Sequence, residues 1–182
     1  MRTVAGVAVL GMLALAGCSS SSADTPQALP SLSASPSPSA VPSAVPTGKD
    51  APTPEGAAAF VRFFYSEISR GFAERDPSIV SRLSAPTCKT CKLYVDSIAE
   101  IRDKNQRSEG GDFTITFAVA PADAGASPRV DVGWDFAAAV LYDASGKVIE
   151  RDPPMKGVEE EVQLMRVGQS WRVATVKRVV KR

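Results

Sequence analysis

The spacing of apolar residues changes once along the chain, near Asp112, and no other feature limits the possible folds as much. Between Ala57 and Phe72, apolar side chains recur every three or four residues, which is the repeat of an amphipathic helix. From Phe113 to Val119 they alternate with other residues, which is the repeat of a strand with one buried face. Helices followed by antiparallel strands predict an α+β fold.

Cap signals divide the first half of the folded part into three expected helices. Thr53 suits the N-cap and Pro54 the first helical position, so a long helix is predicted from Pro54 to about Glu74. Asp76-Pro77 repeats this signal and predicts a short second helix. A third helix is predicted to continue from the segment Thr87-Cys88-Lys89-Thr90-Cys91, and its apolar face begins with Cys91 and Tyr94 at helical spacing.

The second half of the folded part, from Asp112 onward, predicts a curved antiparallel sheet of about four or five strands. Gly110-Gly111 is expected to separate the sheet from the helices. The alternating run from Val130 to Tyr142 is so long that we expect a kink or bulge, at Gly133. The last two strands are expected to form a hairpin across Gly168-Gln169. We therefore expect a domain over residues 54–182 in which three helices pack on this sheet.

Residues 1–17 have the features of a secretory signal peptide. Arg2 is the only charge before Asp24, and the apolar run Val4 to Ala16 follows it. At about 1.5 Å per residue this run makes a helix of roughly 20 Å, which is too short for a hydrocarbon core of about 30 Å. A signal peptide is therefore predicted rather than a membrane span.

The signal ends in Leu15-Ala16-Gly17-Cys18, which resembles the lipobox of bacterial lipoproteins. The resemblance implies that Cys18 carries acyl chains such as palmitate and becomes the first residue of the mature protein. Two or more acyl chains anchor a protein stably. The alternative is an ordinary cleaved signal whose cysteine has no such role. We expect a protein held by its lipid on the extracytoplasmic face of the cell membrane.

Residues 18–53 are expected to be the lipidated cysteine and a disordered tether. Serine and proline dominate from Ser19 to Thr53, without aromatic residues or any apolar repeat. Such a segment cannot bury enough apolar surface to offset the entropy of ordering.

The composition excludes several classes of protein. The sequence has no histidine, which excludes Ser-His-Asp and Cys-His catalysis and a histidine-ligated zinc site. Removing Arg2 with the signal leaves equal numbers of basic and acidic residues, whereas a nucleic-acid-binding domain needs a basic surface. We expect no catalytic residues, no metal, no cofactor and no nucleic-acid partner.

Cys88 and Cys91 allow three interpretations. Three residues apart on a helical turn, their Cα atoms lie about 5 Å apart, inside the range of a disulfide, and disulfides persist in exported proteins. A structural disulfide is therefore the favoured interpretation. A redox-active pair usually follows a strand of a βαβ unit, whereas a helix precedes this one. A metal site lacks a second cysteine pair or histidine to complete four ligands.

The candidate side chains for a binding site lie on the expected strands. Asp131 and Asp135 are expected to face solvent, and consecutive Glu159, Glu160 and Glu161 cannot all point the same way. Four aromatic residues could line an apolar pocket, although plain core packing is the simpler interpretation. They are Phe117, Trp134, Tyr142 and Trp171.

Helices followed by a curved sheet that ends in Gly168-Gln169-Ser170-Trp171-Arg172-Val173 resemble the nuclear-transport-factor-2-like (cone, cystatin-like) domain. The tether, the helix Ala57 to Tyr65 and the segment from Pro86 to Cys91 are similar to a lipoprotein family of high-GC Gram-positive bacteria. That likeness covers Pro54 to about Val180. Relatives resembling ketosteroid isomerase place a buried Asp in the cone as general base.

Three functions follow as hypotheses. The first is a non-enzymatic cell-surface lipoprotein whose domain binds another envelope component or serves as a scaffold. The second is a carrier that holds a small apolar ligand inside the cone. The third is an isomerase- or dehydratase-like enzyme. A dry interior filled by side chains would favour the first, and a buried Asp whose carboxyl group points into an open pocket would favour the third.

Overall fold

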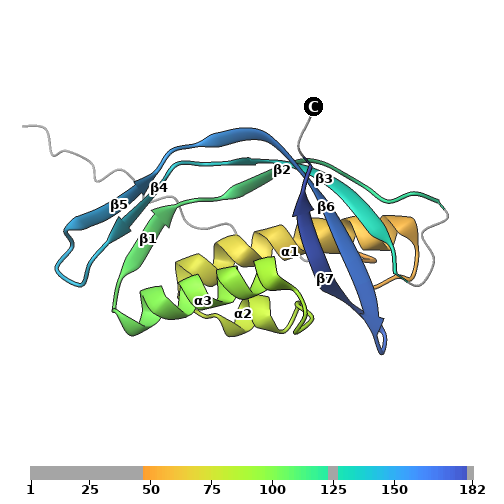
Figure 1. The fold of residues 1–182 in the computed structure, drawn as a ribbon, viewed down its shortest axis with the longest axis horizontal. Coiled ribbons are helices and arrows are strands. Elements are labelled where there is room, and N and C mark those ends of the chain that lie inside the picture. Colours follow the sequence, from red (N-terminus) through yellow and green to blue (C-terminus); the bar gives the residue numbers. More distant parts are fainter. Residues whose placement is uncertain (1–46, 123–126, 180–182) are drawn as a thin grey trace, which may run out of the picture. The chain divides into compact units, whose positions relative to one another are not determined.

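The computed structural model describes residues 47–122 and 127–179 (Figure 1). The predicted signal peptide, Cys18 and most of the predicted tether lie outside the described residues. Within the described residues, none of the helices combines the length and the apolar character that crossing a bilayer requires.

The three expected helices are present. They are α1 (Pro54–Glu74), α2 (Ser78–Ser81) and α3 (Lys89–Asp103). Thr53 caps α1 as predicted, because its side-chain oxygen accepts a hydrogen bond of 3.1 Å from the backbone N–H of Gly56. The helix ends where Arg75 adopts a left-handed conformation, with φ of 56°.

In the described part of the chain, seven antiparallel strand segments follow the helices and form two sheets, in the orders β1-β4-β5 and β2-β3-β6-β7. The segments are β1 (Arg107–Gly110), β2 (Phe113–Val119), β3 (Arg129–Phe136), β4 (Ala139–Tyr142), β5 (Val148–Asp152), β6 (Met155–Val167) and β7 (Ser170–Arg178). The α+β class is confirmed, with helices on one side of the sheets (Figure 1). The final hairpin turns at Gly168-Gln169, as predicted.

The sheet is divided because three strands are interrupted next to one another. The breaks fall at Gly111-Asp112 between β1 and β2, at Ala137-Ala138 between β3 and β4, and at Pro153-Pro154 between β5 and β6. Gly110 and Gly111 have φ of 74° and 82°, which favour glycine, and the prolines lack the N–H that would continue a ladder. The glycine pair therefore divides two strands, and does not end the helical part as predicted.

The strand does not kink at Gly133, because β3 continues to Phe136 and the chain breaks at Ala137-Ala138. A bulge does lie beside Gly133, but on the partner strand β2, where the register shifts between Ile115 and Phe117. Gly133 has a different structural role. It lies opposite Phe117 on β2, and a Cβ atom there would stand 2.2 Å from the Phe117 ring. The strand therefore uses glycine to make room for a neighbouring aromatic side chain.

Two residues before the predicted boundary at Pro54 contact the folded domain. The N–H of Trp171 donates to the backbone oxygen of Ala51 over 3.0 Å, and Arg166 donates to that of Asp50 over 2.7 Å. These bonds hold residues of the predicted tether against the β6–β7 hairpin.

The core lies between α1 and the concave side of the four-stranded sheet. Phe60, Phe64 and Ile68 of α1 are fully buried against inward residues such as Val132 and Leu164. The segment before α3 extends this layer by pairing with the free edge of β7, where Val173 exchanges backbone hydrogen bonds with the segment 83–85.

Candidate functional site: a pocket between the helices and the sheet

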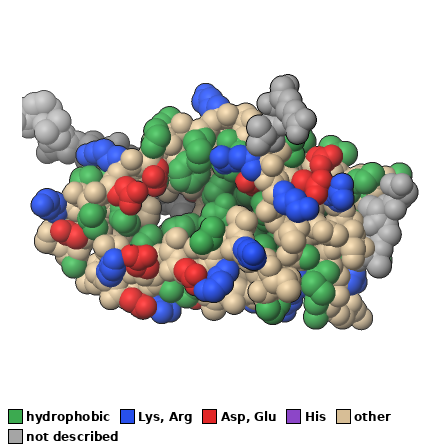
Figure 2. Space-filling view, viewed as in Figure 1, with side chains coloured by type: hydrophobic (Ala, Val, Ile, Leu, Met, Phe, Trp, Pro, Cys, Tyr) green, Lys and Arg blue, Asp and Glu red, His purple; other side chains and the backbone are tan. Residues whose placement is uncertain are grey.

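The interior of the domain is not completely filled. A pocket of about 370 Å³ opens between α1, α3 and the sheets, and it reaches every strand. In the space-filling view, hydrophobic side chains gather around a hollow between the helices and the sheet (Figure 2). Aromatic residues form most of its large lining side chains: Phe72, Tyr94, Phe113, Trp134 and Phe136.

Phe113 is the centre of this aromatic wall. Its ring centre lies 5.0 Å from that of Trp134, 5.2 Å from Phe136, 5.3 Å from Tyr65 and 6.4 Å from Tyr94. The rings meet edge to face or tilted, which is the favourable arrangement for aromatic pairs. The wall is therefore held in place by its own packing.

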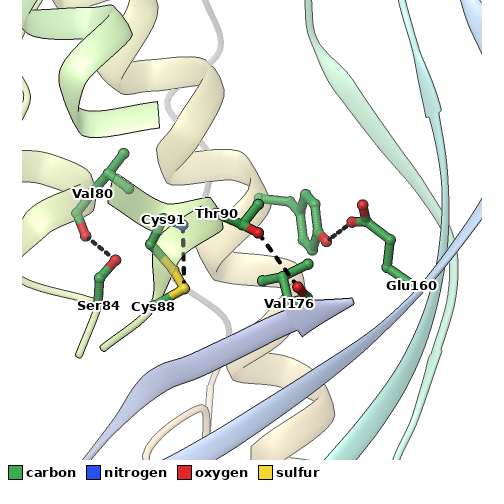
Figure 3. Close-up of a disulfide and its surroundings, with 8 residues drawn as sticks. Val80, Ser84, Cys88, Thr90, Cys91, Glu160 and Val176 are labelled. Carbon is green, nitrogen blue, oxygen red and sulfur yellow. Dashed lines mark hydrogen bonds between the residues drawn. A yellow bond between two sulfur atoms is a disulfide. The ribbon is translucent and has the colours of Figure 1, made fainter. Parts of the chain in front are cut away.

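One buried carboxylate lines the apolar pocket. Glu160 of β6 is only 7% exposed and lines the pocket. Its Oε2 accepts two hydrogen bonds, from the Tyr65 hydroxyl over 2.5 Å and from the Trp134 indole N–H over 2.9 Å (Figure 3 shows the bond from the tyrosine). Within residues 47–122 and 127–179, no donor bonds to Oε1. One oxygen is therefore held by the protein, and the other is left to the pocket.

The two tyrosines beside this carboxylate remain protonated at neutral pH. Burial raises the pKa of the Tyr65 hydroxyl far above its usual range, and the negative charge of Glu160 raises it further. The same two causes raise the pKa of Tyr94. Tyr65 therefore stays a hydrogen-bond donor to Glu160.

Arg178 supplies a positive charge at the pocket. It lies opposite Glu160 on the neighbouring strand and also lines the pocket, with its guanidinium 5.9 Å from the centre of the Trp134 ring. In the described part of the chain, neither Arg178 nor any other cation forms an ion pair with Glu160. Asp152 adds a second carboxylate to the lining.

Of the four aromatic residues predicted for a pocket, only Trp134 lines this one. A register shift between Ile115 and Phe117 turns Phe117 to the outer face, where it is 37% exposed. Tyr142 lies beyond the break in its strand, with Arg107 stacked 4.2 Å from its ring centre. Trp171 is buried near the β6–β7 turn, where it binds the N-terminal segment of the domain.

Cys88 and Cys91 form a disulfide at the start of α3, with their Cα atoms 5.3 Å apart (Figure 3). Both residues are almost completely buried, and the backbone N–H of Cys91 also donates to the Cys88 sulfur. Burial opposes a redox role, because reactive thiols are partly exposed.

Neither of the two aspartates that were expected to face solvent is buried. Asp131 is exposed, and Asp135 is half-buried, where it accepts a hydrogen bond from the backbone N–H of Gly157 over 2.8 Å. Among the residues that the structure describes, no group of acidic or cysteine side chains could hold a metal ion.

Glu160 was missed as a site residue, although a signal for it exists. Val162 and Leu164 follow it at two-residue steps and are fully buried, so the same alternation turns Glu160 inward. The sequence predicts Phe113 only as part of the apolar face of its strand and assigns no role to Tyr65, because no local pattern shows that these two residues meet.

Neither a protein-family model nor a curated protein matches the sequence. Among solved structures, the intermembrane-space region of the chloroplast protein ARC6 aligns with a TM-score of 0.51 and 12% identity, over 70% of this chain and 96% of that chain. An NTF2-like protein of Rhodospirillum rubrum aligns with a TM-score of 0.42 and 14% identity, over 66% of this chain and 98% of that chain. A protein with a cystatin-like fold from Caulobacter vibrioides aligns with a TM-score of 0.39 and 11% identity, over 69% of this chain and 89% of that chain.

The likeness to the chloroplast protein region shows the fold alone, and the two lower scores add no argument to it. The arrangement of three helices on antiparallel sheets of three and four strands is consistent with the NTF2-like cone that the sequence resembles.

Proposed function

We propose that this domain is a non-enzymatic binding module that holds a small, mainly apolar ligand in the pocket between its helices and sheets. The observation that carries the proposal is the aromatic pocket of about 370 Å³ with one buried carboxylate in its wall. Sites for small molecules typically measure about 300–1,000 Å³ and combine apolar walls with a few polar groups. A pure scaffold would need no such opening, and a filled interior would pack better.

Two small aromatic probes test this role, the uncharged propylbenzene and the cationic phenethylamine. Each is titrated into the isotope-labelled domain while the indole N–H resonance of Trp134 is followed by NMR. Ser108→Trp places a large side chain into the pocket from its rim, because Ser108 lines it from β1. Glu109→Trp is the matched control, since the neighbouring side chain points to the other face of the strand.

We expect saturable binding of at least one probe, lost in Ser108→Trp and kept in Glu109→Trp. Binding of neither probe, or binding that Ser108→Trp does not change, would refute the pocket as a ligand site.

Glu160 also favours the enzymatic alternative, because a carboxylate in an apolar pocket is the usual setting of a general base. An isomerase of this kind would remove a proton from the carbon beside a carbonyl group and return it. In heavy water, a ketone probe such as phenylacetone would then exchange that hydrogen for deuterium faster with the wild-type domain than with Glu160→Gln. We expect equal rates, because we assign Glu160 to binding.

We further propose that the protein is a lipoprotein anchored through Cys18 on the extracytoplasmic face of the cell membrane, with residues after Cys18 as a tether. The lipobox-like ending of the signal supports this location. The disulfide supports export, since disulfides are rare in the reducing cytosol.

Replacing Cys18 with Ser and fractionating the cells tests the anchor. We expect the variant to leave the membrane fraction, while Cys88→Ser, which leaves the lipobox intact, stays in it. A Cys18→Ser protein that remains fully membrane-bound contradicts the assignment.

A further inference from the structure

We infer that the pocket selects ligands that carry a protonated amine on an apolar body, and that Glu160 binds the amine. This inference rests on the proposed function and adds to it the chemical class of the ligand.

The free oxygen of Glu160 defines the polar group that fits. Tyr65 and Trp134 both donate to Oε2, and no donor among the described residues reaches Oε1. An ionised carboxylate offers acceptors only, so a ligand group at Oε1 has to be a donor. A donor that carries a positive charge makes the strongest hydrogen bond to a carboxylate.

The charge balance of the lining points the same way. Glu160 and Asp152 face the pocket against a single described cation, Arg178. A carboxylate that is only 7% exposed is costly to bury without a positively charged partner, and none pairs with Glu160 within residues 47–122 and 127–179. A ligand ammonium would supply that partner.

The aromatic wall is also suited to a cation. The faces of Trp and Tyr rings attract positive charge, and Trp134 and Tyr94 both line the pocket. The Arg178 guanidinium already lies 5.9 Å from the centre of the Trp134 ring, so a cation can reach this part of the pocket. Arg178 is exposed at the end of an edge strand and can move aside for a ligand.

A ligand with a carboxylate at Arg178 is the competing possibility. Its charge would lie near both Glu160 and Asp152, which would repel it. The observations therefore favour the amine, and the anion becomes an outcome of the test.

The test compares three probes of similar size on the wild-type domain: phenethylamine, propylbenzene and phenylacetate. Affinities are measured by NMR titration at neutral pH, again with the Trp134 indole N–H as the reporter. We expect phenethylamine to bind about tenfold more tightly than propylbenzene or better, as a charge-assisted hydrogen bond provides. Phenylacetate should bind more weakly than propylbenzene.

Two variants assign the preference to one side chain. Glu160→Gln keeps the size and an acceptor for Tyr65 and Trp134 but removes the charge, so the preference for phenethylamine should fall about tenfold. Glu161→Gln makes the same change on the opposite face of β6, where Glu161 pairs with Arg129 over 3.2 Å, and should keep the preference. If Glu160→Gln does not fold, the comparison of probes on the wild-type domain still decides.

The outcomes separate the two proposals. If propylbenzene binds and phenethylamine binds no better, the pocket remains a ligand site and the amine inference is overturned. Preferred binding of phenylacetate, lost in Arg178→Gln, also overturns it in favour of an anionic ligand. If no probe saturates, the proposed function fails and the inference fails with it.

Discussion

Removing the Tyr65 hydroxyl measures how strongly the protein holds the pocket carboxylate. In Tyr65→Phe the ring remains in the aromatic cluster, while the hydrogen bond of 2.5 Å to Glu160 Oε2 is lost. A hydrogen bond to a charged group contributes about 1.5–3 kcal/mol to stability. Because the Trp134 N–H still donates to the same oxygen, we expect a loss within this range. For a domain of this size the loss corresponds to a fall in Tm of roughly 5–10 °C.

Urea unfolding followed by circular dichroism measures the change in the free energy of unfolding. Tyr142→Phe is the control, because no hydrogen bond from its hydroxyl appears in the described residues, and it should change stability by less than about 0.5 kcal/mol. In a Glu160→Gln background, Tyr65→Phe removes a neutral hydrogen bond and should cost only about 0.5–1.5 kcal/mol. Equal losses in both backgrounds would refute the idea that Tyr65 stabilises a charged group.

Three further predictions concern stability. Replacing Cys88 and Cys91 together by Ala should lower the free energy of unfolding by about 1–3 kcal/mol in urea titrations, and an unchanged midpoint would contradict a structural disulfide. Gly110→Ala, where φ is 74° and a Cβ would lie 2.2 Å from the Ala138 carbonyl oxygen, should cost more than Gly146→Ala, where φ is 85° but the space is open. Above pH 10, unfolded tyrosines lose protons that the two buried tyrosines retain, so stability should fall by up to about 1.4 kcal/mol per pH unit for each, and a flat alkaline profile would contradict their burial.

Local signals in the sequence were enough to predict the helices and the final hairpin. Thr53 and Pro54 define the start of α1 because a cap depends on atoms only a few residues apart. Cys88 and Cys91 meet for the same reason, since one helical turn brings them together. The polar strand β1 was missed because Arg107–Gly110 has no apolar alternation and forms only by pairing with β4.

The tertiary structure determines which side chains line the pocket. Alternation shows that successive side chains of a strand face opposite sides, but a bulge reverses the sides beyond it, and bulges depend on the partner strand. The shift between Ile115 and Phe117 is such a case, and it sends Phe117 outward. Glu160 meets Tyr65 across 95 residues of chain, and no local pattern reports a contact of that range. Local patterns in the sequence therefore indicated where the helices and the apolar strands form, while the pairing of distant strands formed β1 and decided which side chains share the pocket.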